Sequence, residues 1–347
     1  MNESASEQRC YERAITPLVS IIIPFYNIAD CVEYCIVSVD SQTFNNFEVI
    51  CVDDGSTDET GTRLDTLATS RPWMRVIHTE NGGLSAARNA GVAIARGTYV
   101  TFVDGDDVIS PVYLESLCTA MESSDNRVVI GRHVNLSYND KPFQDVVWET
   151  DIRWVMLTKD ELVDRMLYDD PMISAWAHLA PKEMYLHSPF PVGKLYEDTL
   201  SYGGHVLAAR SFAVVENQIY GYIKGRGGSI TKRRKAPLAQ AENFYEMVEY
   251  LDGLIERDVP GHGQALAFHK CLELTRLSLL LDIVDVSECP SRVAELRNAC
   301  TSYVRGALLG VLRDRRVSSI NKVRLALFAI SPKVFRLSYR VATRDKQ

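Results

Sequence analysis

The amino-acid sequence predicts an α/β protein in which a mostly parallel sheet flanked by helices, a Rossmann-like arrangement, is followed by a helical C-terminal region. Between residues 18 and 131, short apolar runs rich in β-branched residues alternate with segments of helical apolar spacing. The runs recur about every 25–30 residues, the length that a strand–helix–strand unit with parallel strands requires. After residue 240, only helical spacing remains.

The strands are expected at the apolar runs. The first run is short and continuous, as in a strand buried on both faces. The expected strands are 18–23, 47–52, 74–78, 98–103 and 127–131. Because ligands of parallel sheets bind beyond the carboxyl ends of the strands, we expect a site in the loops after the first four.

Helices are expected between these strands, at 30–42, 56–69 and 84–96. We expect Asp30 to cap the first of them, because an N-cap carboxylate accepts from free backbone N–H groups. The second opens on a Ser-x-x-Glu capping box at Ser56. The buried face expected for the first helix consists of Val32, Cys35, Ile36 and Val39.

The later part of the chain is more loosely patterned from about 140 to 225 and then breaks at a Gly- and Lys/Arg-rich segment, 224–235. A helical region follows the break. Its expected helices are 240–257, 264–284, 291–312 and 320–345, the last interrupted by Pro332.

The composition excludes several classes of protein. With 347 residues, 46% apolar residues, 24% charged residues and a mean hydropathy of -0.09, the chain is an ordinary globular one. Its longest uncharged stretch, between Arg13 and Asp30, is too short and too interrupted by proline to span a membrane. A net charge of -7 argues against nucleic-acid binding over the whole surface. The eight cysteines form no C-x-x-C pair, so we expect reduced core thiols in a cytoplasmic protein.

The loop after the fourth strand reads DGDD (104–107). Asp104 and Asp106, separated by the small Gly105, place two carboxylates within reach of one cation. Carboxylate oxygens suit Mg²⁺ or Mn²⁺, and few protein ligands leave coordination positions for phosphate oxygens. The alternative interpretation of these residues is a calcium-binding turn or a helix cap.

Four motifs stand in order at these strand ends: VSIIIPFYN, EVICVDDGSTDET, NGGLSAARNAG and GTYVTFVDGDD. Together they resemble the nucleotide-sugar domain of glycosyltransferase family 2, which has the GT-A fold. The resemblance is close over 17–131 and looser to 231. It implies an N-terminal tail at 1–16, a catalytic domain at 17–231 whose acceptor side is 132–231, and a helical region at 232–347.

The resemblance also implies roles for single residues in binding a UDP-sugar. Pro24 and Tyr26 of PFYN, whose last residue is Asn27, would line the uracil pocket. Asp54 would accept from the uracil imide, and Arg88 would lie at the carbonyl edge of the base.

The phosphate side of the donor site is implied in the same way. Gly82 and Gly83 would let the backbone approach the nucleotide closely. Asp104 would contact the ribose or the metal's water shell, and Asp106 would coordinate a Mn²⁺ or Mg²⁺ ion that bridges the diphosphate. Gly105 lies between them.

YEDT (196–199) matches the place of the catalytic base in the family, which makes Asp198 the expected base and Glu197 a supporting or acceptor-binding residue. AWAHL (175–179) carries Trp176, and it has His178 where many relatives have Lys or Arg. GRGGSIT (225–231) resembles a closing segment. The candidates for closing over the diphosphate are Arg226, Ser229 and Lys232.

The function implied is inverting, metal-assisted transfer of a sugar from a UDP-sugar to a hydroxyl of a saccharide or lipid-linked saccharide, extending a surface polysaccharide or glycolipid. The alternatives are a sugar-phosphate nucleotidylyltransferase and a non-catalytic module that binds sugar nucleotides. The first alternative is weakened because PFYN is neither Gly-rich nor basic. The donor sugar, the linkage and the oligomeric state are not indicated by the sequence.

The C-terminal end of the chain is strongly basic. Residues 301–347 hold 11 Lys/Arg against 2 Asp/Glu, and apolar residues interleave with basic ones over 313–347. One interpretation is a segment that binds the anionic inner face of a cell membrane, which would make the protein peripheral there. The other is a packed helix whose basic face is solvated.

Overall fold

The computed structural model describes residues 16–122, 128–140, 143, 146–168, 174–209, 211–226, 236–284 and 289–344. The chain divides into two units. The first consists of Met1–Thr158, Ser174–Gly193 and Ala208–Arg226, and the second of Lys159–Ile173, Lys194–Leu207 and Gly227–Gln347. The boundary expected near residue 231 lies outside the described residues.

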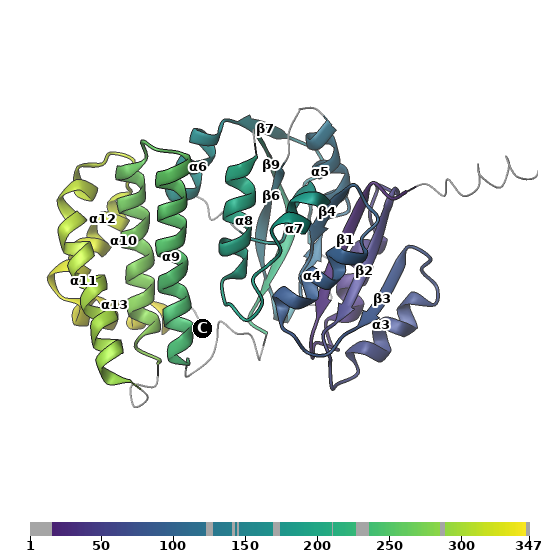
Figure 1. Cartoon of the computed structure of the whole chain (residues 1–347), viewed down its shortest axis with the longest axis horizontal. Helices are drawn as coiled ribbons and strands as arrows, with labels where there is room; N and C mark the ends of the chain where they lie inside the picture. Colours follow the sequence, from purple (N-terminus) through teal and green to yellow (C-terminus); the bar gives the residue numbers. More distant parts are fainter. Residues whose placement is uncertain are drawn as a thin grey trace, which may run out of the picture. The chain divides into compact units, whose positions relative to one another are not determined.

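The first unit is built on a sheet whose leading four strands are parallel (Figure 1). They are β1 (Val19–Phe25), β2 (Phe47–Asp53), β3 (Met74–His78) and β4 (Tyr99–Phe102), in the spatial order β3-β2-β1-β4. The helices between them are α2 (Val32–Asp40), α3 (Thr60–Ala68) and α4 (Leu84–Ile94). The predicted fold class and these strands are confirmed.

Beyond β4 the sheet is mixed and continues in the order β8-β6-β9-β5, with β7 paired to β9. These strands are β8 (His178–Pro181), β6 (Val128–Ser137), β9 (Phe212–Lys224), β5 (Val108–Ile109) and β7 (Trp154–Leu157). The remaining elements of this unit are α5 (Tyr113–Glu122), the 3₁₀ turn η1 (Tyr138–Asp140) and α7 (Lys182–His187). β6 and β9 run parallel, whereas β8 lies antiparallel to both β4 and β6.

The core of the first unit forms where the apolar runs predicted it. All seven residues of β1 are buried, and the predicted face of α2 is fully buried against the sheet. Two predicted caps are wrong. The α2 helix begins at Val32 without a side-chain cap, and the hydroxyl of Ser56 accepts from the N–H of Asn27 instead of capping α3. Both side chains serve contacts between loops, which outweigh the local capping pattern.

The second unit is helical and has its own core. Its helices are α6 (Lys159–Tyr168), α8 (Glu197–Ala208), α9 (Leu238–Asp258), α10 (Gly263–Leu280), α11 (Pro290–Arg313), α12 (Ser319–Ile330) and α13 (Pro332–Arg344). Phe268, Leu277 and Phe328 are among its buried residues. The four predicted C-terminal helices are confirmed, including the interruption at Pro332, which begins α13.

The hydropathy of the helices and the state of the cysteines can be compared with the expectations from composition. In the part of the chain that the structure describes, no helix is both long enough and apolar enough to cross a membrane. The seven described cysteines are all free, and six of them are buried. The expectation of unpaired core thiols is confirmed for the six buried residues, whereas Cys289 is only partly buried.

Candidate active site

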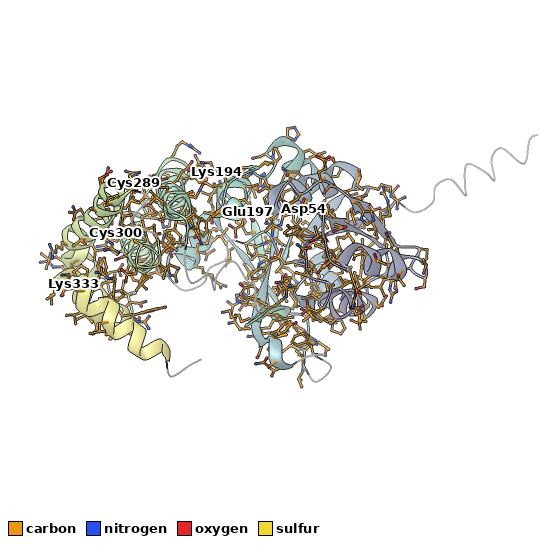
Figure 2. The ribbon with its side chains drawn as sticks, turned by 90° about the horizontal axis from the view of Figure 1, so that it is seen from below. Asp54, Lys194, Glu197, Cys289, Cys300 and Lys333 are labelled. Carbon is orange, nitrogen blue, oxygen red and sulfur yellow. The ribbon has the colours of Figure 1, made fainter. Side chains whose placement is uncertain are left out.

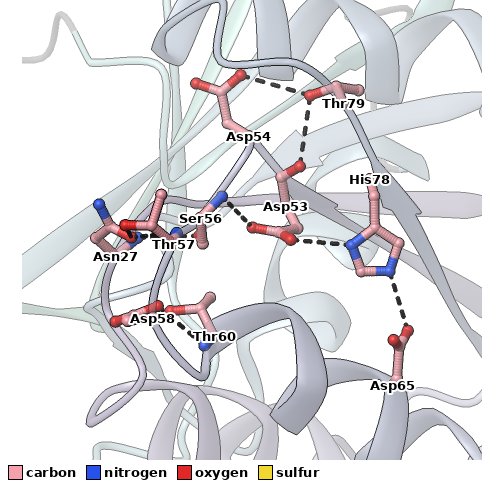
Figure 3. Close-up of polar contacts among 10 residues, drawn as sticks. All are labelled: Asn27, Asp53, Asp54, Ser56, Thr57, Asp58, Thr60, Asp65, His78 and Thr79. Carbon is pink, nitrogen blue, oxygen red and sulfur yellow. Dashed lines mark hydrogen bonds and ion pairs between the residues drawn. The ribbon is translucent and has the colours of Figure 1, made fainter.

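The loops after β1 and β2 are joined by hydrogen bonds between backbone and side chains (Figure 3). Asn27 has a left-handed backbone, with φ of 51°. Its N–H donates to the Ser56 hydroxyl at 3.0 Å, and its side-chain oxygen accepts from the N–H of Thr57 at 2.8 Å. Two further N–H groups of the β1 loop donate to Asp58 and Thr60. The polar residues of both motifs therefore fix one loop against the other.

A carboxylate–imidazole–carboxylate chain links the ends of β2 and β3 (Figure 3). Asp53 Oδ2 lies 2.9 Å from Nδ1 of His78, whose Nε2 lies 3.1 Å from Asp65 Oδ1. The hydrogen bond to Asp53, supported by Asp65, raises the pKa of His78. This chain is absent from the sequence prediction, although the Asp at the end of one strand and the His at the end of the next were visible signals.

Asp54 anchors the glycine-rich loop after β3. Its buried carboxylate accepts from the N–H of Gly82 and of Gly83, each at 2.9 Å. Gly83 has φ of 82°, a conformation that side chains rarely adopt, and it precedes the first turn of α4. The loop that was expected to approach a nucleotide is thus held in place by the residue that was expected to read the base.

Arg88 and Asp104, predicted for different parts of the donor, are in direct contact. Arg88 is 2% exposed on α4, and its Nη2 donates to Oδ1 of Asp104 at 2.8 Å. Its guanidinium carbon lies 5.4 Å from the centre of the Phe190 ring. Arg88 is therefore a buried side chain that orients a carboxylate at the end of β4 and not a solvated helix charge.

The turn between Asp104 and Asp106 is pressed against the end of β1. A Cβ on Gly105 would lie 2.6 Å from the Phe25 ring and 2.7 Å from the Pro24 carbonyl oxygen, so only glycine fits. The Tyr34 hydroxyl donates to the Asp106 carbonyl oxygen at 3.1 Å. Burial, with the negative charge of Asp104 as a second cause, raises the pKa of Asp106 to about 6.

The third acid of DGDD, Asp107, has a structural role that the sequence pattern does not reveal. Asp107 is buried; it accepts from the Tyr220 hydroxyl at 2.7 Å and from the N–H of Ile223 at 2.8 Å. Tyr220 also accepts from the N–H of Asp104 at 3.1 Å. Burial, together with the charges of Asp106 and Asp104, raises the pKa of Asp107 well above its ordinary value.

An aromatic stack adjoins this turn. The ring of Trp176 lies over Tyr220, with centres 4.5 Å apart and an angle of 12°, and over Tyr222 at 5.7 Å and 17°. Tyr220 and Tyr222 are two residues apart on β9, so their side chains lie on the same face of the strand. This spacing was the sequence signal for a shared aromatic surface. Trp176 is thus linked to the acidic turn through Tyr220, whose hydroxyl contacts Asp104 and Asp107. His178 begins β8 and is 1% exposed.

Arg226 and Tyr26 lie at the end of β1. The Arg226 Nη2 donates to the Asn27 carbonyl oxygen at 3.1 Å, and its Nε lies 3.7 Å from Asp30. Its positive charge lowers the pKa of Asp106, although burial is the stronger influence. The side chain of Tyr26 is half-exposed, which leaves its ring accessible. Arg226 is therefore in place next to the acidic turn.

The remaining candidates lie elsewhere. Glu197 and Asp198 form the first turn of α8 in the second unit, where Asp198 Oδ1 accepts from the N–H of Thr199 at 2.7 Å. Ser229 and Lys232 lie outside the described residues. The structure thus brings together the predicted donor-side residues of the first unit, and it describes the predicted base as part of the other unit.

The acidic turn has the chemistry of a divalent-cation site with few protein ligands. Among the described residues, no group of three or more His, Cys, Asp or Glu side chains is arranged to enclose a metal. Asp104 and Asp106 nevertheless provide two carboxylates whose mutual repulsion contributes to the raised pKa of Asp106. A cation would relieve that repulsion, so these two residues fit an ion that takes its other ligands from a substrate.

The chain matches known glycosyltransferases in sequence. The family model described as Glycosyl transferase family 2 matches residues 20–184. Glycosyltransferase GlyG of Streptococcus pneumoniae serotype 4 is 30% identical over 239 residues, which cover 67% of this chain and 79% of GlyG. The uncharacterized glycosyltransferase EpsJ of Bacillus subtilis is 45% identical over 113 residues, and there the match spans only 33% of each protein.

Solved structures share the fold at lower identity. TarS of S. aureus (residues 1–349), in complex with UDP-GlcNAc, superposes with a TM-score of 0.63 and 21% identity, covering 93% of this chain and 92% of that one. The mannosyltransferase PcManGT of Pyrobaculum calidifontis, in complex with GDP-Man and Mn²⁺, gives a TM-score of 0.53 at 15% identity, covering 92% and 89%. These likenesses extend over both units.

Proposed function

Because the chain belongs to glycosyltransferase family 2, we propose that it transfers a sugar from a UDP-sugar to a hydroxyl of a saccharide or lipid-linked saccharide. The observation that supports this best is the convergence of Asp54, Arg88, Asp104 and Asp106 at the carboxyl ends of β2 and β4. In parallel sheets this edge is where nucleotides bind.

The uridine is proposed to bind between the β1 loop and the glycine-rich loop. The exposed Tyr26 ring, next to Pro24, offers a stacking face. Asp54 Oδ1 accepts from Gly82 and, at 3.4 Å, from the Thr79 hydroxyl, whereas Oδ2 accepts only from Gly83, so a lone pair of Oδ2 remains for the uracil imide. The complexes of TarS with UDP and UDP-GlcNAc, in a shared fold, support a uridine donor.

Asp104 and Asp106 are the residues that we propose to hold a Mn²⁺ or Mg²⁺ ion with the diphosphate. When bound, such an ion neutralises the negative charge that develops on the departing nucleoside diphosphate. Arg88 keeps one oxygen of Asp104 engaged, and Arg226 adds a positive charge beside Asp106. The Mn²⁺ in the PcManGT complex supports this assignment.

Asp198 is the proposed general base. An acceptor hydroxyl must lose its proton as it attacks, and a positioned carboxylate that takes the proton contributes about 10²–10⁴-fold. Direct attack on the sugar inverts its anomeric configuration, so an α-linked UDP-sugar gives a β-linked product. Glu197, adjacent at the start of α8, is proposed to support the acceptor, as is Trp176. His178 is 1% exposed and so is not available to contact an acceptor.

We also propose that the reaction takes place in the cytoplasm. Six of the seven described cysteines are buried free thiols, the state expected in a reducing compartment. The acceptor would then be a growing polysaccharide or glycolipid on the inner face of the cell membrane.

A panel of nucleotide sugars tests the proposal. With Mn²⁺ present, we expect UDP-sugars to raise the melting temperature and at least one of them to be hydrolysed slowly without acceptor. Asp198→Asn should retain UDP binding but lose turnover by about 10²–10⁴-fold, whereas Glu246→Gln, at an exposed ion pair with Lys194, should behave as the parent. UDP-sugar binding without any hydrolysis would instead indicate a binding module.

A further inference from the structure

The α12 helix has two apolar faces, of which only one is buried. Leu325, Phe328 and Ala329 point into the core of the helical unit. On the opposite side of the helix, Ile320 and Val323 are two-thirds exposed, and Ile330 is 77% exposed. A surface helix ordinarily carries polar residues on its outer face. Burial within the unit therefore does not account for the outer face of α12.

The exposed apolar face continues along α13. Phe335 turns inward and packs edge-on against Phe328, with ring centres 5.3 Å apart, which fixes the helix to the core. Val334 and Leu337, one turn apart on the other side, remain more than half exposed. We call the exposed apolar side chains the outer stripe. The outer stripe consists of Ile320, Val323, Ile330, Val334 and Leu337.

Basic side chains border the outer stripe. Among the described residues, no carboxylate pairs with Lys322 or Lys333, and Figure 2 shows Lys333 at the start of α13 on the edge of the helical unit. The inward-facing Arg336, in contrast, lies 3.2 Å from Asp282. The outer surface of α12 and α13 thus combines exposed aliphatic residues with positive charge that is not neutralised.

We propose that the outer stripe inserts into the interface of an anionic lipid bilayer, with α12 and α13 lying in its plane. Aliphatic residues then reach the acyl boundary, and Lys322 and Lys333 meet anionic head groups. A protein partner is less well matched, because protein interfaces are enriched in aromatic residues and depleted of lysine. The assignment goes beyond the transfer reaction and does not depend on it.

Sedimentation with vesicles tests the assignment without any donor or acceptor. The full chain should pellet with phosphatidylglycerol vesicles and much less with phosphatidylcholine alone. Val323→Ser combined with Ile330→Ser should weaken binding about 10-fold or more. Lys322→Gln combined with Lys333→Gln should weaken binding to phosphatidylglycerol by about 30-fold. Val37→Ser, at a similarly exposed valine of α2, should bind as the parent.

Two results would overturn the assignment. One is equal pelleting of the parent and the stripe variants, with circular dichroism showing that both are folded. The other is a parent that ignores vesicles but self-associates in light scattering, with the stripe variant monomeric; the outer stripe would then be an interface between copies. Because no donor is used, either result leaves the test of the transferase activity untouched.

Discussion

The guanidinium of Arg88 donates to the carboxylate of Asp104 across 2.8 Å, from a helix position that is 2% exposed. This contact joins the glycine-rich loop and α4 to the acidic turn, so the base side and the phosphate side of the proposed donor site share one ion pair. A buried arginine is costly unless it is paired, and here the pairing also fixes the direction of a proposed metal ligand.

Replacing Arg88 with Met is expected to lower both stability and nucleotide affinity. Removing one partner of a buried pair costs about 3 kcal/mol, and the 24% exposure of the Asp104 side chain favours the low end of the usual range. Chemical denaturation and calorimetry with UDP and Mn²⁺ measure the two effects. Arg63→Met, at an exposed pair with Glu59, is the control and should change neither. Unchanged UDP affinity in Arg88→Met would show that the ion pair does not contribute to the donor site.

Much of this site follows from the sequence, because it is local to strand ends. The run at 74–78 forms β3 with the predicted bounds, and the four loops lie at one sheet edge as parallel strands require. The contacts that hold the site were not predictable in the same way. Asp107 pairs with Tyr220 from more than a hundred residues away, through a β5–β9 pairing that no local pattern encodes. The capping patterns at Asp30 and Ser56 were misleading because both side chains have partners in other loops.

Mn²⁺ binding is expected to depend on pH through Asp106. Its pKa is raised to about 6, and a metal ligand must be deprotonated, so affinity should fall about tenfold per pH unit below pH 6 and level off above it. Titration of Mn²⁺ alone, followed by the magnetic resonance signal of the free ion, avoids the ionisation of UDP itself. A flat profile between pH 5 and pH 8 would contradict the role of Asp106.

Asp106→Asn should have opposite effects on stability with and without the ion. Between the ordinary value of 3.8 and about 6, the folded state holds a proton that the unfolded state has lost, so raising the pH through this window destabilises the metal-free protein. Asn removes that cost, and the variant should melt higher than the parent at pH 8 without metal. Addition of Mn²⁺ and UDP should raise the melting temperature of the parent but not that of the variant. Thermal melts of parent and variant, each with and without Mn²⁺ and UDP, measure these effects. A variant that melts at a lower temperature than the parent without metal would contradict the prediction.

Gly105→Ala is expected to disrupt the acidic turn. The new methyl would lie 2.6 Å from the Phe25 ring and 2.7 Å from the Pro24 carbonyl oxygen, and the strand backbone has no room to yield. Overpacking of this kind costs about 1–3 kcal/mol, and UDP binding with Mn²⁺ should fall with it. Gly253→Ala in α9, where no atom lies within 4 Å, should instead stabilise by up to about 1 kcal/mol. Denaturant midpoints for both variants decide the point, and equal effects would refute the packing argument.

Tyr220→Phe tests whether the buried support beneath the acidic turn matters for binding as well as for folding. The lost hydroxyl leaves the N–H of Asp104 without its acceptor and Asp107 with one donor fewer, which costs about 1–3 kcal/mol of stability. Tyr113→Phe is the matched control, because its equally buried hydroxyl is 2.6 Å from Thr101 and contacts neither acid. Both variants should melt at lower temperature, but only Tyr220→Phe should weaken Mn²⁺-dependent UDP binding, since only its hydroxyl positions the turn. Equal loss of affinity in the two variants would show that general loosening of the core, and not the Tyr220 contacts, governs the site.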